Sequence, residues 1–424
     1  MKTGRILAAI STPLALLLAQ TVLWAQEQEG IQEAQPDPVE QIILGNRLAA
    51  GVEDSALSGA GGEFLFKQAA QARIVVIGEA HLTREIPRLA QALALSLRPH
   101  GYGVLAIETG PSGAELLTEE LTGAEDLTPL KETLHRFPLT LPFFNKVEEA
   151  ELVRRSLAQG YQVWGLDQEF LASDRYLLDR LLELAPDEEA AAYVRELQAL
   201  AMEGAQAYIA TQSADNVFYN AATPEQFEQL RSKMSGAGEE AAKIVDEMEA
   251  TAHIYRLFRS GKNYQSNYDR IRLMKQHLNE GFRLIYQGVD TPRILMKFGS
   301  VHGARGYSAL NQLDIGNQAA ELAALMGGDS LHLQVIGARY DREGQVIEVG
   351  QRAPHLKVFF DNLLESQLTV FDLRPLRPYF HRKSNRQGYE QLNDLVWGYD
   401  LLAVYPTLHS AQDLNPNPLA GAND

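Results

Sequence analysis

Short runs of apolar, mostly β-branched residues recur along the chain, and stretches with helical spacing separate them. Residues 74–77 are continuously apolar, as expected of a strand buried on both faces of a parallel sheet. Ile86, Leu89, Ala90 and Leu93 then follow at the spacing of one helix face. Strands that alternate with helices predict an α/β fold with a mostly parallel central sheet flanked by helices. Further strands are expected at 104–109, 162–167, 293–299, 331–336 and 400–405.

The stretch between Asp167 and Arg293 lacks a strand pattern and is rich in the strong helix formers Ala, Glu, Leu, Gln and Arg. It predicts a large all-helical insertion over residues 174–290. Because the insertion leaves the sheet just after one strand and re-enters it at another, we expect it to cap the strand ends. Its helices are expected at 174–185, 187–203, 224–233, 237–260 and 266–287.

Two local signals add detail to this outline. Ser112 and Glu115 have the spacing of a capping box, which predicts a helix start at Ser112. Residues 338–350 have the pattern of an exposed hairpin, with a turn at Glu343 and Gly344.

The N-terminus has the pattern of a signal peptide over residues 1–25. Lys2 and Arg5 precede a mostly apolar stretch, and Ala25 offers a small residue for cleavage. The alternative is an uncleaved anchor, since the stretch is almost long enough to span a bilayer. Either interpretation places the body outside the cytoplasm, and cleavage leaves a periplasmic or secreted protein without stable membrane insertion. Beyond it we expect a flexible acidic leader at 26–45, a single α/β domain at 46–412 and a disordered tail at 413–424.

Composition narrows the classes of partner and of chemistry. A net charge of −17 argues against nucleic acid and against an anionic membrane surface as partners. The chain has no cysteine, which removes thiolate nucleophiles, Cys-ligated zinc and disulfides. It also has no Gly-x-Ser-x-Gly or His-Glu-x-x-His motif, so an ordinary serine hydrolase or a zincin is not expected. The partner that we expect is a small-molecule substrate.

Acids and histidines follow four of the predicted strands. Glu79 and His81 end the first strand, Glu108 the second, Asp167 the third, and His302 follows the fourth. The carboxyl ends of parallel strands meet at one edge of a sheet, so we expect these five side chains to converge. A polar residue closing a strand explains any one of them alone, whereas five at four strand ends favour a shared functional site.

Two kinds of chemistry fit these residue types. A histidine paired with a carboxylate can activate water as a general base, which requires no cofactor. Alternatively, His81, His302, Glu79 and Glu108 could bind a divalent metal ion. The residues alone leave both possibilities open.

Five short motifs follow one another along the chain: Gly78-Glu79-Ala80-His81, Ile107-Glu108, Gly165-Leu166-Asp167, Arg270-x-x-x-Met274 and Gly299-Ser300-Val301-His302. Their order and rough spacing resemble those of the erythromycin esterase-like superfamily, from about residue 73 to 405. The resemblance implies a hydrolase of an ester, lactone or amide, in which His81 activates water while Glu79, Glu108 and His302 arrange the site.

The first motif departs from the esterases, because His81 lies two residues after Glu79 rather than three. This shorter spacing is similar to that of haem-binding, iron-regulated lipoproteins and of TraB/TIKI-type proteases. The resemblance therefore implies alternatives on the same fold: a non-catalytic haem- or metal-binding protein, or a divalent-metal-dependent protease.

Arg270 stands on the last predicted helix of the insertion, beside its buried stripe. A guanidinium there can reach the acidic cluster or hold a carbonyl or carboxylate of the substrate. An ordinary surface arginine is the competing interpretation, and the resemblance favours the functional one. We group Asp167 and Glu85 with it as substrate-binding residues, and we expect Glu85 to pair with Arg270.

Overall fold

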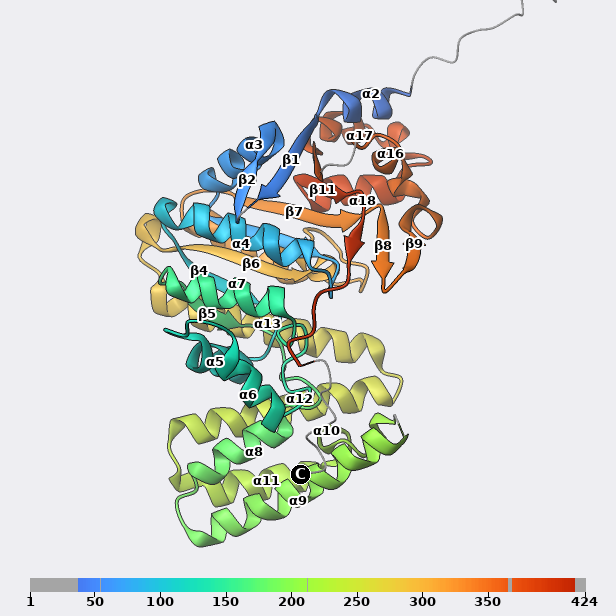
Figure 1. Cartoon of the computed structure of the whole chain (residues 1–424). Helices are drawn as coiled ribbons and strands as arrows, with labels where there is room; N and C mark the ends of the chain where they lie inside the picture. Colours follow the sequence, from blue (N-terminus) through green and yellow to red (C-terminus); the bar gives the residue numbers. More distant parts are fainter. Residues whose placement is uncertain (1–36, 54, 212, 365–367, 416–424) are drawn as a thin grey trace, which may run out of the picture.

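The computed structural model describes residues 37–53, 55–211, 213–364 and 368–415. The predicted signal peptide lies outside these ranges. Within them, no helix has both the length and the apolar character needed to cross a membrane. Figure 1 shows a central sheet covered by helices, with a bundle of helices extending from one end.

Within the described residues, nine strands form the main sheet, in the order β2-β1-β10-β11-β7-β3-β6-β4-β5. The strands from β11 to β5 are parallel, whereas β2, β1 and β10 add an antiparallel edge. This confirms the expected α/β fold with a mostly parallel sheet. The strands are β1 (Arg47–Glu53), β2 (Ala56–Ser58), β3 (Ile74–Glu79), β4 (Tyr102–Ile107), β5 (Gln162–Gly165), β6 (Arg293–Gly299), β7 (Ser330–Gly337), β10 (Leu368–Asp372) and β11 (Leu401–Tyr405).

Helices cover both faces of the sheet because successive side chains of a buried strand point to opposite faces. In β3, Val75 and Ile77 belong to the core under α4 (Glu85–Leu97) and α7 (Val147–Ala158). Ile74 and Val76 belong to the opposite core, under α13 (Asn263–Ile285) and α15 (Ile315–Leu325). A third core joins α2 (Pro38–Gly45) to β10, β11 and the C-terminal helices. The other helices around the sheet are α2 (Pro38–Gly45), α3 (Gly59–Gln71), α5 (Pro111–Leu121), α6 (Thr128–Arg136), α14 (Ser300–Gly303), α15 (Ile315–Leu325), α16 (Lys357–Phe360), α17 (Arg377–His381) and α18 (Glu390–Gly398).

The expected helical insertion is present after β5. Its first helices pack around a core of their own and form the bundle beyond the β5 edge of the sheet, whereas α13 runs between the bundle and the sheet (Figure 1). The insertion therefore reaches the strand ends mainly through α13. Its helices are α8 (Asp174–Glu183), α9 (Glu188–Thr211), α10 (Phe218–Ala221), α11 (Pro224–Lys233), α12 (Glu239–Arg259) and α13 (Asn263–Ile285).

The expected hairpin forms from β8 (Arg339–Arg342) and β9 (Gln345–Glu348), and it turns at Glu343 and Gly344. It belongs to a small second sheet, in which β12 (Leu408–His409) pairs with β8.

Three local predictions are wrong. Part of the expected flexible leader forms α2, because Asp37 caps this helix and its apolar side chains are buried. Residues 413–415 of the expected disordered tail are bound to the fold, since the amide of Leu414 donates to the carbonyl of Asn145. The Ser112 capping box does not form: α5 begins at Pro111, and Oε1 of Glu169 accepts the Ser112 amide at 2.7 Å instead.

Candidate functional site at the strand ends

The residues expected to converge do so at the carboxyl ends of β3, β6, β4 and β5, which are neighbours in the sheet. Glu108 lies at the centre of this cluster. Its Oε2 is 3.6 Å from Nε2 of His81, and its Oε1 is 3.8 Å from Nε2 of His302 and 3.1 Å from Nη2 of Arg270. The sheet order thus brings together side chains from four separate stretches of the chain.

Gly299, at the end of β6, allows this close approach. Its backbone amide donates to Oε2 of Glu108 at 2.6 Å. A Cβ atom at this position would lie 2.7 Å from Nε2 of His81. Any other residue would therefore displace the imidazole, so the glycine is part of the site.

His81 is oriented by Glu79 and Phe143. Nδ1 of His81 lies 2.9 Å from Oε1 of Glu79, and the Phe143 ring stacks on the imidazole with centroids 4.2 Å apart. Burial opposes the charged imidazolium, but the hydrogen bond to Glu79 and the charge of Glu108 raise the pKa of His81 overall. With 29% of its side chain exposed, His81 is accessible to a small molecule.

Two residues that adjoin His81 have a strained backbone. Leu82, the next residue in the chain, has a φ of 66°, and Phe143 has a φ of 64°. Bulky residues rarely adopt this left-handed conformation, which persists where the surrounding structure enforces it and is common at functional sites.

Lys297 is a central residue of the site that the sequence did not identify. It is buried in β6, with Nζ 2.6 Å from Oε1 of Glu79 and 2.7 Å from Oε1 of Glu149. Burial pushes the pKa of Glu79 up, but the charge of Lys297 and the hydrogen bond with His81 lower it to about 2. Glu79 is therefore a carboxylate at neutral pH. A lysine amid apolar strand residues was the available signal, although its partners could not be deduced.

Glu149, on α7, completes this buried chain of charges. Burial raises its pKa to about 7, against the opposing charge of Lys297. Oε2 of Glu149 and Oε2 of Glu79 are both buried and have no hydrogen-bond partner in the part of the chain that the structure describes. Lys297 is therefore the cation shared by two buried carboxyl groups.

His302 has a carboxylate partner of its own, Asp314 at the start of α15. Nδ1 of His302 lies 2.9 Å from Oδ2 of Asp314, which is completely buried. Burial opposes protonation, but the hydrogen bond to Asp314 and the charge of Glu108 raise the pKa of His302. The two histidines are thus arranged in the same way: Nδ1 of each faces its own carboxylate partner, and Nε2 of each faces Glu108.

Arg270 reaches the cluster from α13, as predicted. Its Nε donates to Oδ1 of Asp167 at 2.8 Å, and its Nη2 binds both Oδ2 of Asp167 and Oε1 of Glu108. Burial opposes ionisation of Asp167, yet the guanidinium lowers the pKa of this carboxyl. Arg270 therefore neutralises two strand-end acids at once.

The predicted pairing of Glu85 with Arg270 is wrong. Oε1 of Glu85 instead lies 2.7 Å from Nδ1 of His409, and its Oε2 accepts the His409 amide. Glu85 starts α4 and binds the C-terminal strand β12, so the structure gives it a role in joining these elements.

The residues of the alternative metal site lie near one another, and Glu79 among them is bound to both His81 and Lys297. Over residues 37–415, outside the gaps given above, no group of three His, Asp or Glu side chains is arranged to hold a metal ion.

Neither a family model nor a curated protein sequence matches the chain. Several solved structures with the same fold do match the chain. A mutant of the erythromycin esterase EreC in its open conformation matches with a TM-score of 0.59 and 16% identity, over 87% of this chain and 99% of that one. A protein from Bacillus cereus matches with a TM-score of 0.56 and 14% identity, over 88% and 98% of the two chains. A succinoglycan biosynthesis protein matches with a TM-score of 0.58 and 13% identity, over 90% and 100%. At these identities the likeness concerns the fold: the chain has an erythromycin esterase-like fold.

Proposed function

We propose that the chain is a hydrolase that uses His81 as a general base to activate water against an ester, lactone or amide of a small molecule. The observation that carries the proposal is the contact between Nδ1 of His81 and Oε1 of Glu79 at 2.9 Å, within an accessible cluster at the strand ends. A carboxylate that accepts from Nδ1–H leaves the Nε2 lone pair of neutral His81 free to take a proton.

In the proposed reaction, Nε2 of His81 takes a proton from water as the oxygen attacks the carbonyl carbon. The carbonyl oxygen gains negative charge, which the guanidinium group of Arg270 stabilises. His81 then returns its proton to the departing alcohol or amine, so the base is regenerated. Both histidines and Arg270 lie within 4 Å of the Glu108 carboxylate, which keeps them together.

Lys297 and Glu79 act in this scheme through His81. The lysine keeps Glu79 ionised at 2.6 Å, and the ionised carboxylate fixes the tautomer and the orientation of the imidazole. Lys297 is thus a positioning residue, because its direct contacts are to carboxylates.

The proposal is tested by measuring turnover of a panel of chromogenic esters and lactones by the wild type and by His81→Ala. Loss of a general base should lower kcat by about 10²–10⁴-fold. His409→Ala is the matched control, since His409 is bound to Glu85. Equal rates for the wild type and His81→Ala would refute the role.

The pH profile of the wild type provides a second readout of the same role. A general base works in its neutral form, so the rate should rise with pH as His81 loses its proton. Because the pKa of His81 is raised from 6.5, this rise should lie above that value. A rate that falls over this range would contradict the assignment.

We also propose that the protein is exported and that its mature form begins near Gln26. The support is the charged start at Lys2 and Arg5, the apolar stretch after them and the small residue Ala25. Mass spectrometry of the protein purified from its native host measures the N-terminus directly. An intact Met1 would contradict cleavage.

A further inference from the structure

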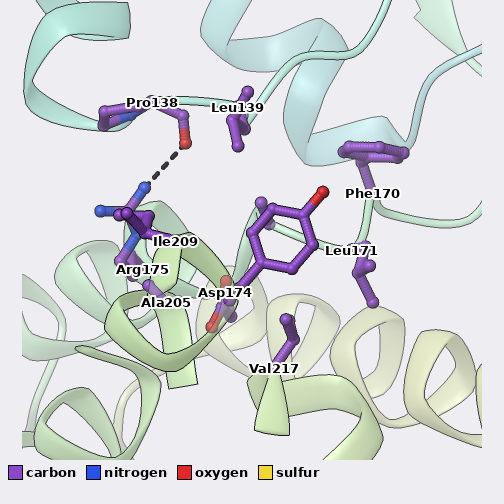
Figure 2. A pocket seen from close by; sticks show the side chains of 11 residues that line it. Pro138, Leu139, Phe170, Leu171, Asp174, Arg175, Ala205, Ile209 and Val217 are labelled. Atoms are coloured by element: carbon purple, nitrogen blue, oxygen red, sulfur yellow. Dashed lines mark hydrogen bonds between the residues drawn. The ribbon is translucent and has the colours of Figure 1, made fainter. Parts of the chain in front are cut away.

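A cavity of about 180 Å³ lies where the helical insertion meets the loop before α7. Pro138 and Leu139 lie along one side of it, Phe170 and Arg175 flank it, and Val217 lies on the opposite side (Figure 2). Ala205, Tyr208 and Ile209 of α9 complete the wall together with Leu171, Ala172 and Asp174. Most of this lining is apolar, and Asp174 and Arg175 are its two charged residues.

The two charged residues of the lining do not make it a site for ions. Nη2 of Arg175 donates to the carbonyl of Pro138 at 2.7 Å, so part of the guanidinium already has a partner (Figure 2). Asp174 is buried, and the loss of hydration raises its pKa to about 7. Because the arginine is held by a backbone carbonyl and the other lining residues are mostly apolar, the cavity favours an uncharged occupant.

The cavity and the strand-end site share two segments of the chain. In the first, Pro138 and Leu139 line the cavity, and Phe143 stacks on His81. Leu139 has a φ of 66° and Phe143 one of 64°, so the surrounding structure holds two strained residues of this loop in place.

The second shared segment runs from Asp167, which holds Arg270, to the cavity residues at 170–175. The two segments are joined directly, since Oγ1 of Thr140 donates to the carbonyl of Ala172 at 3.3 Å. Phe170 is 36% exposed and leaves an apolar surface at the cavity rim.

We infer that this cavity binds one uncharged apolar group of the substrate, either a benzene-sized ring or a branched alkyl group, while the bond to be cleaved lies at the strand ends. The size supports this, because an apolar cavity of about 150 Å³ is enough to bind benzene. This inference rests on the proposed hydrolase function, and it predicts a preference for esters that carry such a group.

The inference is tested by filling the cavity with Ala205→Phe. Ala210→Phe is the matched control, because Ala210 lies on the same helix but is exposed and outside the lining. Isothermal titration calorimetry with benzyl alcohol as the probe should show binding to the wild type, to Ala210→Phe and to His81→Ala. Binding to Ala205→Phe should be at least about tenfold weaker, as for a pocket that loses the space for one apolar group.

Turnover gives the second measurement. The ratio of kcat/KM for benzyl acetate over methyl acetate should fall by about tenfold or more in Ala205→Phe and stay unchanged in Ala210→Phe. If Ala205→Phe does not fold, Val217→Phe fills the cavity from the opposite wall.

A wild type that binds benzyl alcohol but cleaves no ester would refute the proposed hydrolase function and would still support the binding site. A wild type that cleaves esters but does not bind the probe, or an Ala205→Phe that binds it equally well, would overturn the inference.

Discussion

Glu79 at the strand ends and Asp174 in the helical insertion are both buried acids, with 4% and 3% of each residue exposed. Their pKa values nevertheless shift in opposite directions. That of Glu79 is lowered to about 2, whereas that of Asp174 is raised to about 7. Burial acts on both in the same sense, so the difference must come from the groups around them.

The sheet provides Glu79 with a counter-charge at a fixed distance. Because β3 and β6 are paired in register, Ile77 lies opposite Lys297 and Glu79 opposite Gly299. The lysine therefore lies two residues along its strand from the residue paired with Glu79, close enough for its amine to reach the carboxylate. A rigid ladder thus places positive charge on the acid that orients His81.

Asp174 has weaker support. It is the first residue of α8, where the charge of the adjacent Arg175 and hydrogen bonds from backbone amides only partly offset the loss of hydration. The guanidinium of the adjacent Arg175 donates to the carbonyl of Pro138. The strand-end site therefore holds ionised side chains for chemistry, whereas the cavity of the insertion has a mostly apolar surface, although each region contains a buried acid.

The largest expected effect is on stability, from Lys297→Met. This change leaves Glu79 and Glu149 buried without their shared counter-charge. Breaking a buried ion pair by removing one partner typically costs about 3–5 kcal/mol. We expect a loss of this size in the free energy of unfolding, measured by urea denaturation at pH 7.

Lys357→Met is the matched control, since Lys357 forms an exposed pair with Asp361 one helical turn away. Such a pair contributes about 0–1 kcal/mol. Adding Glu149→Gln to Lys297→Met should recover part of the loss, because one buried charge is removed. If Lys297→Met matched the wild type in stability, the fold would not depend on this counter-charge, and the contrast between Glu79 and Asp174 would need another cause.

The strand-end acids and histidines could be predicted because the relevant signal is local. Glu79, Glu108 and Asp167 each follow a short apolar run, and the ends of parallel strands meet at one edge whatever the intervening chain does. The sequence therefore predicted which side chains gather there, and it predicted that Arg270 reaches them from the insertion.

The partners of these residues were not predictable in the same way. Lys297 and Glu149 are 148 positions apart, and their contact depends on how α7 packs across the sheet. For Glu85 the nearness in sequence was misleading. It lies only four residues after His81, yet α4 directs it toward His409, 324 positions later, and away from the strand-end site. The antiparallel edge formed by β2, β1 and β10 likewise depends on pairing between the two ends of the chain.

The smallest effect we predict is the pH dependence contributed by Asp174. Its folded pKa of about 7 is above the ordinary value of 3.8, so between these values the folded chain holds a proton that the unfolded chain has released. The stability from this group is therefore complete below about pH 3.8 and is lost as the pH rises through about 7.

Asp174→Asn removes this titration and keeps the shape of the side chain. Urea denaturation from pH 4 to 8 should show the wild type losing at least about 1.4 kcal/mol more than the variant, the equivalent of one pKa unit. Asp394→Asn, at an exposed position, should follow the wild type. Parallel curves for the wild type and Asp174→Asn would mean that Asp174 is ionised in the folded protein, and the cavity would then favour a cationic occupant over an uncharged one.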